Sequence, residues 1–411
     1  MQEVDIKKYT PTSLTVTMYD TQSSTYGFTF NTECKPLCPV ICIKKACDTD
    51  WTEYPFTSYE ATTVNKDVQD VPYYISKTEV VLERNTLYSY FVCDKGTDAR
   101  TNETTIRTND CSKTAFSFAH VGDSQEGAAE FGRVLSCTCE NMDFLVHTGD
   151  FVQRTKYEYQ WTEMLDGNYQ YLSKISVMPL GGNHESKFGS SAGKYEIEKH
   201  FNNKLAIEQS TIVGCFYSFV YGDVKFIMLN TNDLEDSRLK PDQYDWLLRE
   251  LKENNCIWTI VSMHNPIYSV GQYGAHPERN GIALALKAQI HEMFAKYNVD
   301  IVLQGHDHAI SRTLPIGIDY KPISESIEYI NGMEYSVNPE GVIYLMNGPA
   351  GTQTRVPVAI EEGLYKYAEC SNAASWAELH IDRNTLTVEV KWHDGEKECT
   401  YYKWGIKKNN K

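Results

Sequence analysis

The sequence predicts two parts: an N-terminal all-β sandwich over residues 1–110, and an α/β domain, an αββα layered sandwich, over residues 111–400. Three observations support this prediction. Short runs of β-forming residues fill the first part. Apolar runs alternate with helical stretches in the second part. The length of 411 residues also suits two domains, at ~100–200 residues each.

Five runs in the first part have the composition and alternation of β-strands. They cover residues 14–18, 26–30, 39–43, 78–82 and 87–92. Strands of this length at close spacing are typical of a β-sandwich. The polar segment that follows, residues 101–110, is expected to be a linker between the two parts.

The second part combines apolar runs with two amphipathic helices. The helix over residues 241–254 is indicated by Tyr244, Leu247 and Leu251, which recur at helical spacing. Residues 281–297 form a second helical candidate. The apolar runs expected to be strands cover residues 115–119, 144–146, 175–180, 257–261 and 299–303.

Each of these five predicted strands is followed by a cluster of Asp, Asn or His, in most cases beside a glycine. The clusters are Gly122-Asp123, Gly149-Asp150, Gly182-Asn183-His184, His264, and Gly305-His306-Asp307-His308. In open α/β sheets, functional sites form just beyond the carboxyl ends of the strands. Five such clusters could therefore converge on one place.

The side chains that would converge there are carboxylates, an amide and imidazoles, without cysteine. Nitrogen and oxygen donors of this kind suit Zn, Fe or Mn, and more than four of them imply two metal ions. Two ions about 3.5–4 Å apart can clamp the attacking and leaving oxygens of an in-line phosphoryl displacement. They also lower the pKa of a bound water toward ~7, which provides a nucleophile at neutral pH.

The order GD, GD, GNHE, H and GHDH resembles that of the calcineurin-like metallophosphoesterases. The flanks of the fourth motif, residues 243–247 and 263–268, are similar to the purple acid phosphatase branch of that superfamily. A fibronectin type III-like β-sandwich before the catalytic domain is also typical of this branch. The resemblance covers nearly the whole chain.

The resemblance implies a role for each motif residue. Asp150 would bridge the two ions and take part in catalysis. Metal 1 would also be bound by Asp123 and His308, and metal 2 by Asn183, His264 and His306. His184 would hydrogen-bond the phosphate and protonate the leaving alkoxide. Asn183 and His184 would thus contact the substrate, as would His276, which lies where related enzymes have a substrate-facing loop.

Two glutamines depart from the family pattern around metal 1. Gln125 stands where the wider superfamily has the histidine of Asp-x-His, and Gln153 stands where purple acid phosphatases have a metal-binding tyrosine. Without that tyrosine, no purple colour is expected. Metal 1 is then either bound by Gln125 through its oxygen, or keeps Asp123, Asp150, His308 and water.

The resemblance implies a dinuclear-metal phosphatase that hydrolyses phosphomonoesters by in-line attack of a metal-bound hydroxide. Two alternatives stay open. The same site could serve a phosphodiesterase or nucleotide pyrophosphatase, because the motifs do not encode the second substituent on phosphorus. The chain could also be a non-catalytic binding protein with a degraded metal 1 site, as Gln125 and Gln153 would allow.

Composition adds limits on partners and location. The net charge of −16 argues against a basic nucleic-acid-binding surface and favours small phosphate esters as partners. No run approaches the ~20 apolar residues of a membrane span. The 12 cysteines favour disulfides, and Asn102-Glu103-Thr104 is a glycosylation sequon. A secreted or vacuolar/lysosomal location is therefore expected, although no signal peptide is visible at residues 1–4. The oligomeric state is not predicted.

Overall fold

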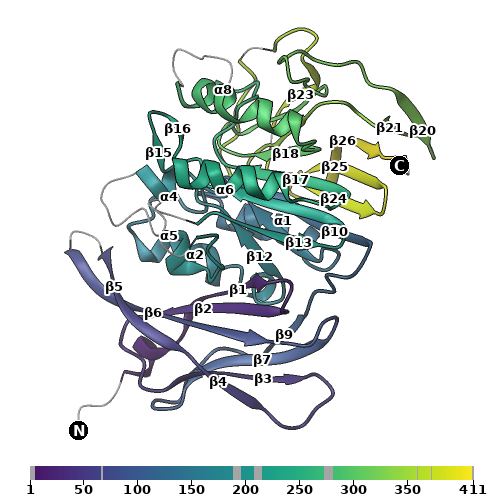
Figure 1. Ribbon diagram of the computed structural model, residues 1–411. Helices are drawn as coiled ribbons and strands as arrows, with labels where there is room; N and C mark the ends of the chain where they lie inside the picture. The colour runs from purple at the N-terminus through teal and green to yellow at the C-terminus, as the bar shows by residue number, and fades with distance from the viewer. Residues whose placement is uncertain are drawn as a thin grey trace.

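The computed structural model describes residues 5–65, 68–187, 196–207, 215–272, 281–358, 360–371 and 373–409. Figure 1 shows an all-β part at the N-terminal end, drawn in purple and blue, and a larger part of mixed helices and strands above it. Strands of the last residues, in yellow, return to the sheet that begins with residues 115–121.

The N-terminal part consists of a short 3₁₀ helix, η1 (Ile6–Tyr9), and two sheets. One sheet has the order β1-β2-β6-β5, with β1 (Thr12–Asp20), β2 (Thr25–Thr32), β6 (Val68–Val81) and β5 (Thr57–Asn65). The other has the order β4-β3-β7-β8, with β4 (Thr52–Pro55), β3 (Pro39–Lys45), β7 (Leu87–Asp94), β8 (Ala99–Arg100), and β9 (Thr104–Arg107) paired to β7. The rings of Phe28 on β2 and Tyr90 on β7 meet edge to face at 5.4 Å between the sheets. The predicted all-β N-terminal part is confirmed.

The segment predicted to be a linker is instead part of this sandwich. Residues 104–107 form β9, and both Thr104 and Thr108 are buried. The hydroxyl of Thr108 donates to the carbonyl of Glu83 at 2.6 Å. Polar side chains can be buried when they are hydrogen-bonded in this way, so polarity alone did not indicate a linker. The boundary at residue 110 falls between β9 and the next strand and stays a prediction.

The second part contains two large mixed sheets. The first has the order β12-β11-β10-β24-β25-β26-β21-β20: β12 (Ser176–Pro179), β11 (Phe144–His147), β10 (Ala115–Val121), β24 (Ser375–Asp382), β25 (Thr385–His393), β26 (Glu398–Lys407), β21 (Met333–Val337) and β20 (Ile327–Ile330). The second has the order β13-β14-β17-β18-β22-β19-β23: β13 (Tyr217–Tyr221), β14 (Val224–Leu229), β17 (Trp258–Met263), β18 (Ile301–Gln304), β22 (Ile343–Asn347), β19 (Ala309–Thr313) and β23 (Tyr365–Cys370). A hairpin of β15 (Leu234–Glu235) and β16 (Arg238–Leu239) stands apart.

Alternate residues of β14 show how these sheets are layered. Phe226 and Met228 belong to the core between the two sheets, where the Phe226 ring lies 5.1 Å from that of Phe118 on β10. Ile227 and Leu229 point the other way and join a second core. Because successive side chains of a strand face opposite sides, β14 has a sheet on one face and helices on the other.

Helices cover the outer faces. The second core is closed by α6 (Pro241–Lys252) and α8 (Gly281–Lys296), which match the two predicted helices. The other helices are α1 (Ala128–Thr138), α2 (Glu158–Asp166), α3 (Tyr169–Leu172), α4 (Asn183–Lys187) and α5 (Glu196–His200). α1 packs against β24 and β25 of the first sheet. The predicted αββα layered sandwich is therefore confirmed.

The C-terminal strands were not among those expected. β26 continues past the predicted end of the domain at residue 400 and reaches Lys407. The tail beyond it is anchored, since Lys408 Nζ lies 2.6 Å from the carboxylate of Asp300. The last residues therefore complete the first sheet.

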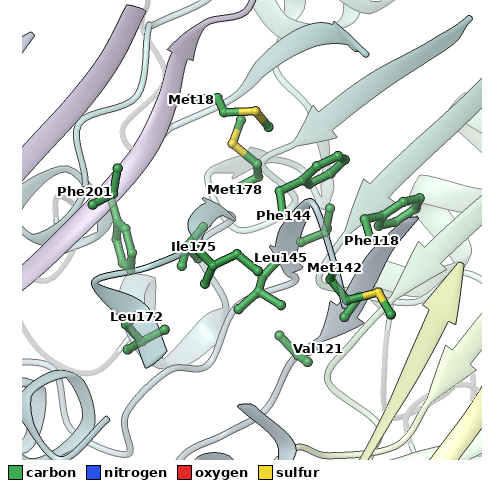
Figure 2. Packing of buried hydrophobic residues seen from close by; sticks show 14 of the residues in the cluster. Met18, Phe118, Val121, Met142, Phe144, Leu145, Leu172, Ile175, Met178 and Phe201 are labelled. Carbon is green, nitrogen blue, oxygen red and sulfur yellow. The ribbon is translucent and has the colours of Figure 1, made fainter. Parts of the chain in front are cut away.

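The β-sandwich packs closely on the α/β part. In Figure 2, Met18 of β1 lies next to Met178 of β12 within one shared hydrophobic cluster. The hydroxyl of Tyr90 donates to the carbonyl of Ser173 at 2.6 Å, and the hydroxyl of Thr17 donates to the carbonyl of Asn202 at 2.5 Å. The two parts thus share a core.

Gly27 on β2 offers a test of this interface. A Cβ at this position would lie 2.3 Å from the carbonyl oxygen of Asn202 and 2.7 Å from Thr17 Oγ1. Alanine normally stabilises a strand interior relative to glycine, but here we expect Gly27→Ala to lower the free energy of unfolding by about 2 kcal/mol through overpacking. Urea denaturation would measure the change. Gly281→Ala is the control, because no atom lies within 4 Å of its Cβ position; equal stability of the two variants would contradict the prediction.

Two further observations concern the surroundings of the protein. Within the described part of the chain, no helix is long and apolar enough to cross a membrane. All twelve cysteines lie in described regions and carry free thiols in the structure. The structure thus gives no support to the predicted disulfides.

Candidate metal centre

The predicted ligands lie at one edge of the two large sheets. Within the first sheet β10, β11 and β12 run parallel, and within the second β14, β17, β18 and β22 run parallel. The carboxyl ends of parallel strands meet at the same edge. Each predicted cluster follows one of these ends: Asp123 after β10, Asp150 after β11, Asn183 after β12, His264 after β17, and His306 and His308 after β18.

One group of ligands forms around Asp150. Ligand atoms of Asp150, His264 and His306 all lie within 4.8 Å of one another. His264 Nε2 lies 3.3 Å from Asp150 Oδ2 and 3.1 Å from Asn183 Oδ1. This group contains the residues expected to bind metal 2 together with the expected bridge.

A second group forms around Asp123. Asp123 Oδ1 lies 3.3 Å from His308 Nε2, as expected for two ligands of metal 1. The backbone N–H of His306 donates to the Asp123 carboxylate at 2.9 Å, which joins this group to the first. All six predicted ligands therefore come together within one site.

Gln125 lies beside this second group, with its amide 3.4 Å from His308 Nε2. When the amide is turned over, its nitrogen donates to the carbonyl of Asp150 at 2.9 Å and to that of Asp123 at 3.3 Å. That orientation gives the amide nitrogen two acceptors and turns the oxygen toward His308. A carbonyl-type oxygen at this place is a suitable metal ligand.

Hydrogen bonds fix the orientation of two of the imidazoles. His264 Nδ1 lies 2.8 Å from the carbonyl oxygen of Thr148, and His308 Nδ1 contacts the carbonyl of Gln353. A ring nitrogen that donates to a carbonyl leaves the other nitrogen free to bind a metal ion. In both rings the free atom is Nε2, which faces a carboxylate.

The backbone of the site is strained. Four of the six predicted ligands have positive φ although they are not glycines: Asp123 (53°), Asp150 (58°), His306 (73°) and His308 (48°). Such conformations are costly and cluster at functional sites. The buried Glu185 holds part of this geometry, because its carboxylate accepts from the N–H groups of Asp150 (2.8 Å), Phe151 (3.0 Å) and Gly182 (2.7 Å).

Burial and the neighbouring charges act in opposite directions on the pKa values of Asp150 and His264. Burial by itself would raise the pKa of Asp150, but the neighbouring imidazoles, His264 foremost, outweigh it and hold this pKa below its ordinary value. Burial would lower the pKa of His264, and the Asp150 carboxylate reverses this and raises it to about 9. Buried carboxylates that stay ionised attract positive charge. The donor set, with carboxylate, imidazole and amide groups, fits a pair of metal ions.

His184 lies at the edge of the ligands. Its Nε2 is 3.7 Å from Asp150 Oδ2, and its Nδ1 is 2.8 Å from the carbonyl oxygen of Gln153. Its side chain is 15% exposed, so it faces both the ligands and solvent. The Gln153 side chain contacts Gln353 at 3.4 Å. His276, predicted to contact substrate, lies outside the described residues.

The sequence reasoning missed one loop of the site, residues 348–355 after β22. Gln353 from this loop contacts His308, and Arg355 Nη1 lies 4.0 Å from Asp307 Oδ1. The signal resembles that of the other motifs, since an apolar run over residues 343–346 leads into Asn347 and Gly348. The loop carries no Asp or His, and for this reason it was not recognised as part of the site.

Comparison with known proteins identifies the class of this domain. Residues 116–309 match the family model described as "Calcineurin-like phosphoesterase". The α/β part of the chain is therefore similar to the calcineurin-like phosphoesterases over residues 116–309.

Within this class, the chain is similar to purple acid phosphatases. It is 27% identical over 192 residues to purple acid phosphatase 15 of Arabidopsis thaliana, covering 45% of this chain and 31% of that protein. It is 25% identical over 246 residues to probable inactive purple acid phosphatase 27 of the same plant, covering 56% of this chain and 38% of that protein. The chain thus matches less than half the length of these relatives.

A solved structure resembles nearly all of the chain. The purple acid phosphatase PPD1 from yellow lupin (Lupinus luteus) seeds superposes with a TM-score of 0.79 over 98% of this chain and 75% of that one, at 17% identity. This similarity extends through the N-terminal all-β part and shows the shared fold.

Proposed function

We propose that the protein is a dinuclear-metal phosphatase that hydrolyses phosphomonoesters. The observation that carries this proposal is the convergence of the predicted ligands from five strand ends. Asp150, His264 and His306 present ligand atoms within 4.8 Å of one another, and Asp123 and His308 lie 3.3 Å apart beside them. Two adjacent groups of N and O donors suit two ions.

The residues divide between two metal positions. Asp123, His308 and Gln125, through its amide oxygen, would hold metal 1. Asn183, His264 and His306 would hold metal 2, and Asp150 would bridge the pair. When bound, such ions supply a hydroxide nucleophile near neutral pH and offset negative charge on the phosphoryl oxygens. The donor types fit Zn, Fe or Mn.

His184 is the candidate general acid. Its imidazole faces the ligands from the rim, where it can hydrogen-bond a phosphoryl oxygen and transfer a proton to the leaving alkoxide. The contact between its Nδ1 and the Gln153 carbonyl at 2.8 Å fixes the ring. Asn183, the adjacent residue, would hold the substrate phosphate together with metal 2.

The proposal is tested by hydrolysis of a chromogenic aryl phosphomonoester from about pH 4 to 8. Metal-stripped protein should be inactive, and Zn, Fe or Mn should restore turnover. No turnover with any metal, together with at most one bound ion per chain, would favour a non-catalytic binding protein. Turnover of diesters but not of monoesters would favour the phosphodiesterase alternative.

The role of Gln125 gives a separate prediction. We expect Gln125→Leu to weaken binding of one ion by roughly 10–100-fold, because a leucine of similar size has no donor oxygen. Metal content after dialysis, measured by elemental analysis, would fall toward one ion per chain. Gln153→Leu is the matched control, since its side chain contacts Gln353 at 3.4 Å. Equal metal content in the two variants would contradict the assignment.

The proposed class also bears on the location of the protein. A secreted or vacuolar/lysosomal location remains the prediction that accompanies a purple acid phosphatase-like enzyme. Asn102 of the glycosylation sequon is exposed, which is compatible with it. Mass spectrometry of protein from its native source would reveal a glycan at Asn102.

A further inference from the structure

A fixed cation lies at the rim of the metal centre. Arg355 belongs to the loop that follows β22, and its side chain is 32% exposed. Two residues before it, the carbonyl of Gln353 contacts the ligand His308. Three residues after it, the N–H of Val358 donates to the carbonyl of Val270 at 2.9 Å. Arg355 therefore lies between a contact with the ligand His308 and a contact with Val270.

Asp307 holds the guanidinium at this place. Arg355 Nη1 lies 4.0 Å from Asp307 Oδ1, and the Asp307 side chain is fully buried. Ser269 Oγ donates to Asp307 Oδ2 at 2.6 Å and also accepts from the N–H of Gly271 at 2.9 Å. The fixed carboxylate places a negative charge beside Arg355, whose side chain is 32% exposed.

Arg355 lies beside the proposed metal ligands and is not one of them. Asp307 lies between the ligands His306 and His308, but its carboxylate packs against the backbone of Gly271. Arg355 thus lies beside the segment that carries His306 and His308.

The overall negative charge of the protein means that an anionic group needs a local cation in order to bind. A net charge of −16 repels anions on average. An anionic group next to the ester phosphate would therefore be bound only where a local cation compensates. A guanidinium fixed at the rim can bind a carboxylate or phosphate through two parallel hydrogen bonds.

We propose that Arg355, positioned by Asp307, selects phosphomonoesters whose alcohol portion carries a second anionic group, such as a phosphorylated hydroxy acid or a bisphosphate. This inference rests on the proposed phosphatase function and specifies its substrate class. The metal ions hold the phosphate to be transferred, and Arg355 holds the second anion. Asp307 acts through Arg355 and is a positioning residue.

The test uses two substrates that differ by one charge, 3-phosphoglycerate and glycerol 3-phosphate. We expect the metal-loaded wild-type protein to prefer 3-phosphoglycerate through a lower KM. Arg355→Gln should raise that KM roughly tenfold, the effect of one charge-assisted contact, and leave kcat and the glycerol 3-phosphate kinetics within about twofold. Arg355→Lys should recover part of the preference, and Asp307→Asn should lose part of it at unchanged metal content.

Arg133→Gln is the matched control, because Arg133 pairs with Glu130 on the surface of α1. Equal effects of Arg355→Gln on both substrates, or no effect on either, would overturn the inference. If the wild-type protein hydrolyses neither ester, the proposed function fails by itself, and calorimetric binding of the two compounds then decides. Weaker binding of 3-phosphoglycerate alone in Arg355→Gln supports the inference, and unchanged binding overturns it.

Discussion

Replacing Asp150 by asparagine is expected to lower kcat by about 10³-fold or more. The side chain would keep its size but lose the charge that, in the proposed site, would be shared by the two metal ions. Loss of metal-based stabilisation of the transition state costs several kcal/mol, and every ~1.4 kcal/mol is tenfold in rate. Hydrolysis of an aryl phosphomonoester by the metal-loaded variant would measure the effect, with bound metal determined on the same sample.

The fold should survive this change. Asp150 Oδ1 accepts from the N–H of His184 at 2.9 Å, and an asparagine oxygen can accept the same bond. The circular dichroism spectrum of Asp150→Asn should therefore match that of the wild-type protein. Undiminished turnover in this variant would refute the assignment of Asp150 as the bridging ligand.

The ligands could be predicted from the sequence because each stands in a short local motif. Asp123, Asp150 and His264 follow apolar runs directly, so the strand ends mark them. Parallel strands then bring distant motifs to one edge of the sheets without further information. The positive φ of Asp123 and Asp150, in contrast, is imposed by contacts between loops and could not be predicted.

Other elements and residues could not be predicted, because they depend on contacts with parts of the chain that are distant in sequence. β9 was expected to be a linker because its threonines look polar, yet Thr104 is buried against the hydroxyl of Ser173 at 3.0 Å. β23 was missed because its side chains are only partly buried, so no apolar alternation marks it. Arg355 was missed because its function depends on Asp307, which lies 48 residues earlier in the chain and becomes a neighbour only in the fold.

Replacing Gly182 by alanine is the second change expected to lower kcat strongly. It alters the geometry of the site without removing any proposed ligand. A Cβ at this position would lie 2.0 Å from Asp150 Oδ1 and 2.5 Å from the Asp150 nitrogen. Gly182→Ala must therefore displace the Asp150 carboxylate or the loop that carries Asn183. A displacement of about 1 Å at a catalytic site can cost roughly 10²-fold in rate, so we expect kcat to fall by about that factor, with weaker metal binding.

Gly181→Ala is a control one residue away. Its Cβ would meet only Ile197 Cγ1 at 3.5 Å and Glu185 Cβ at 3.8 Å, which are ordinary contacts. We expect this variant to retain activity within about twofold, because no ligand has to move. If both alanine variants lost activity equally, general damage to the loop would explain the loss. A fall confined to Gly182→Ala would instead place the origin of catalysis in the position of the Asp150 carboxylate, since every ligand of the site would still be present.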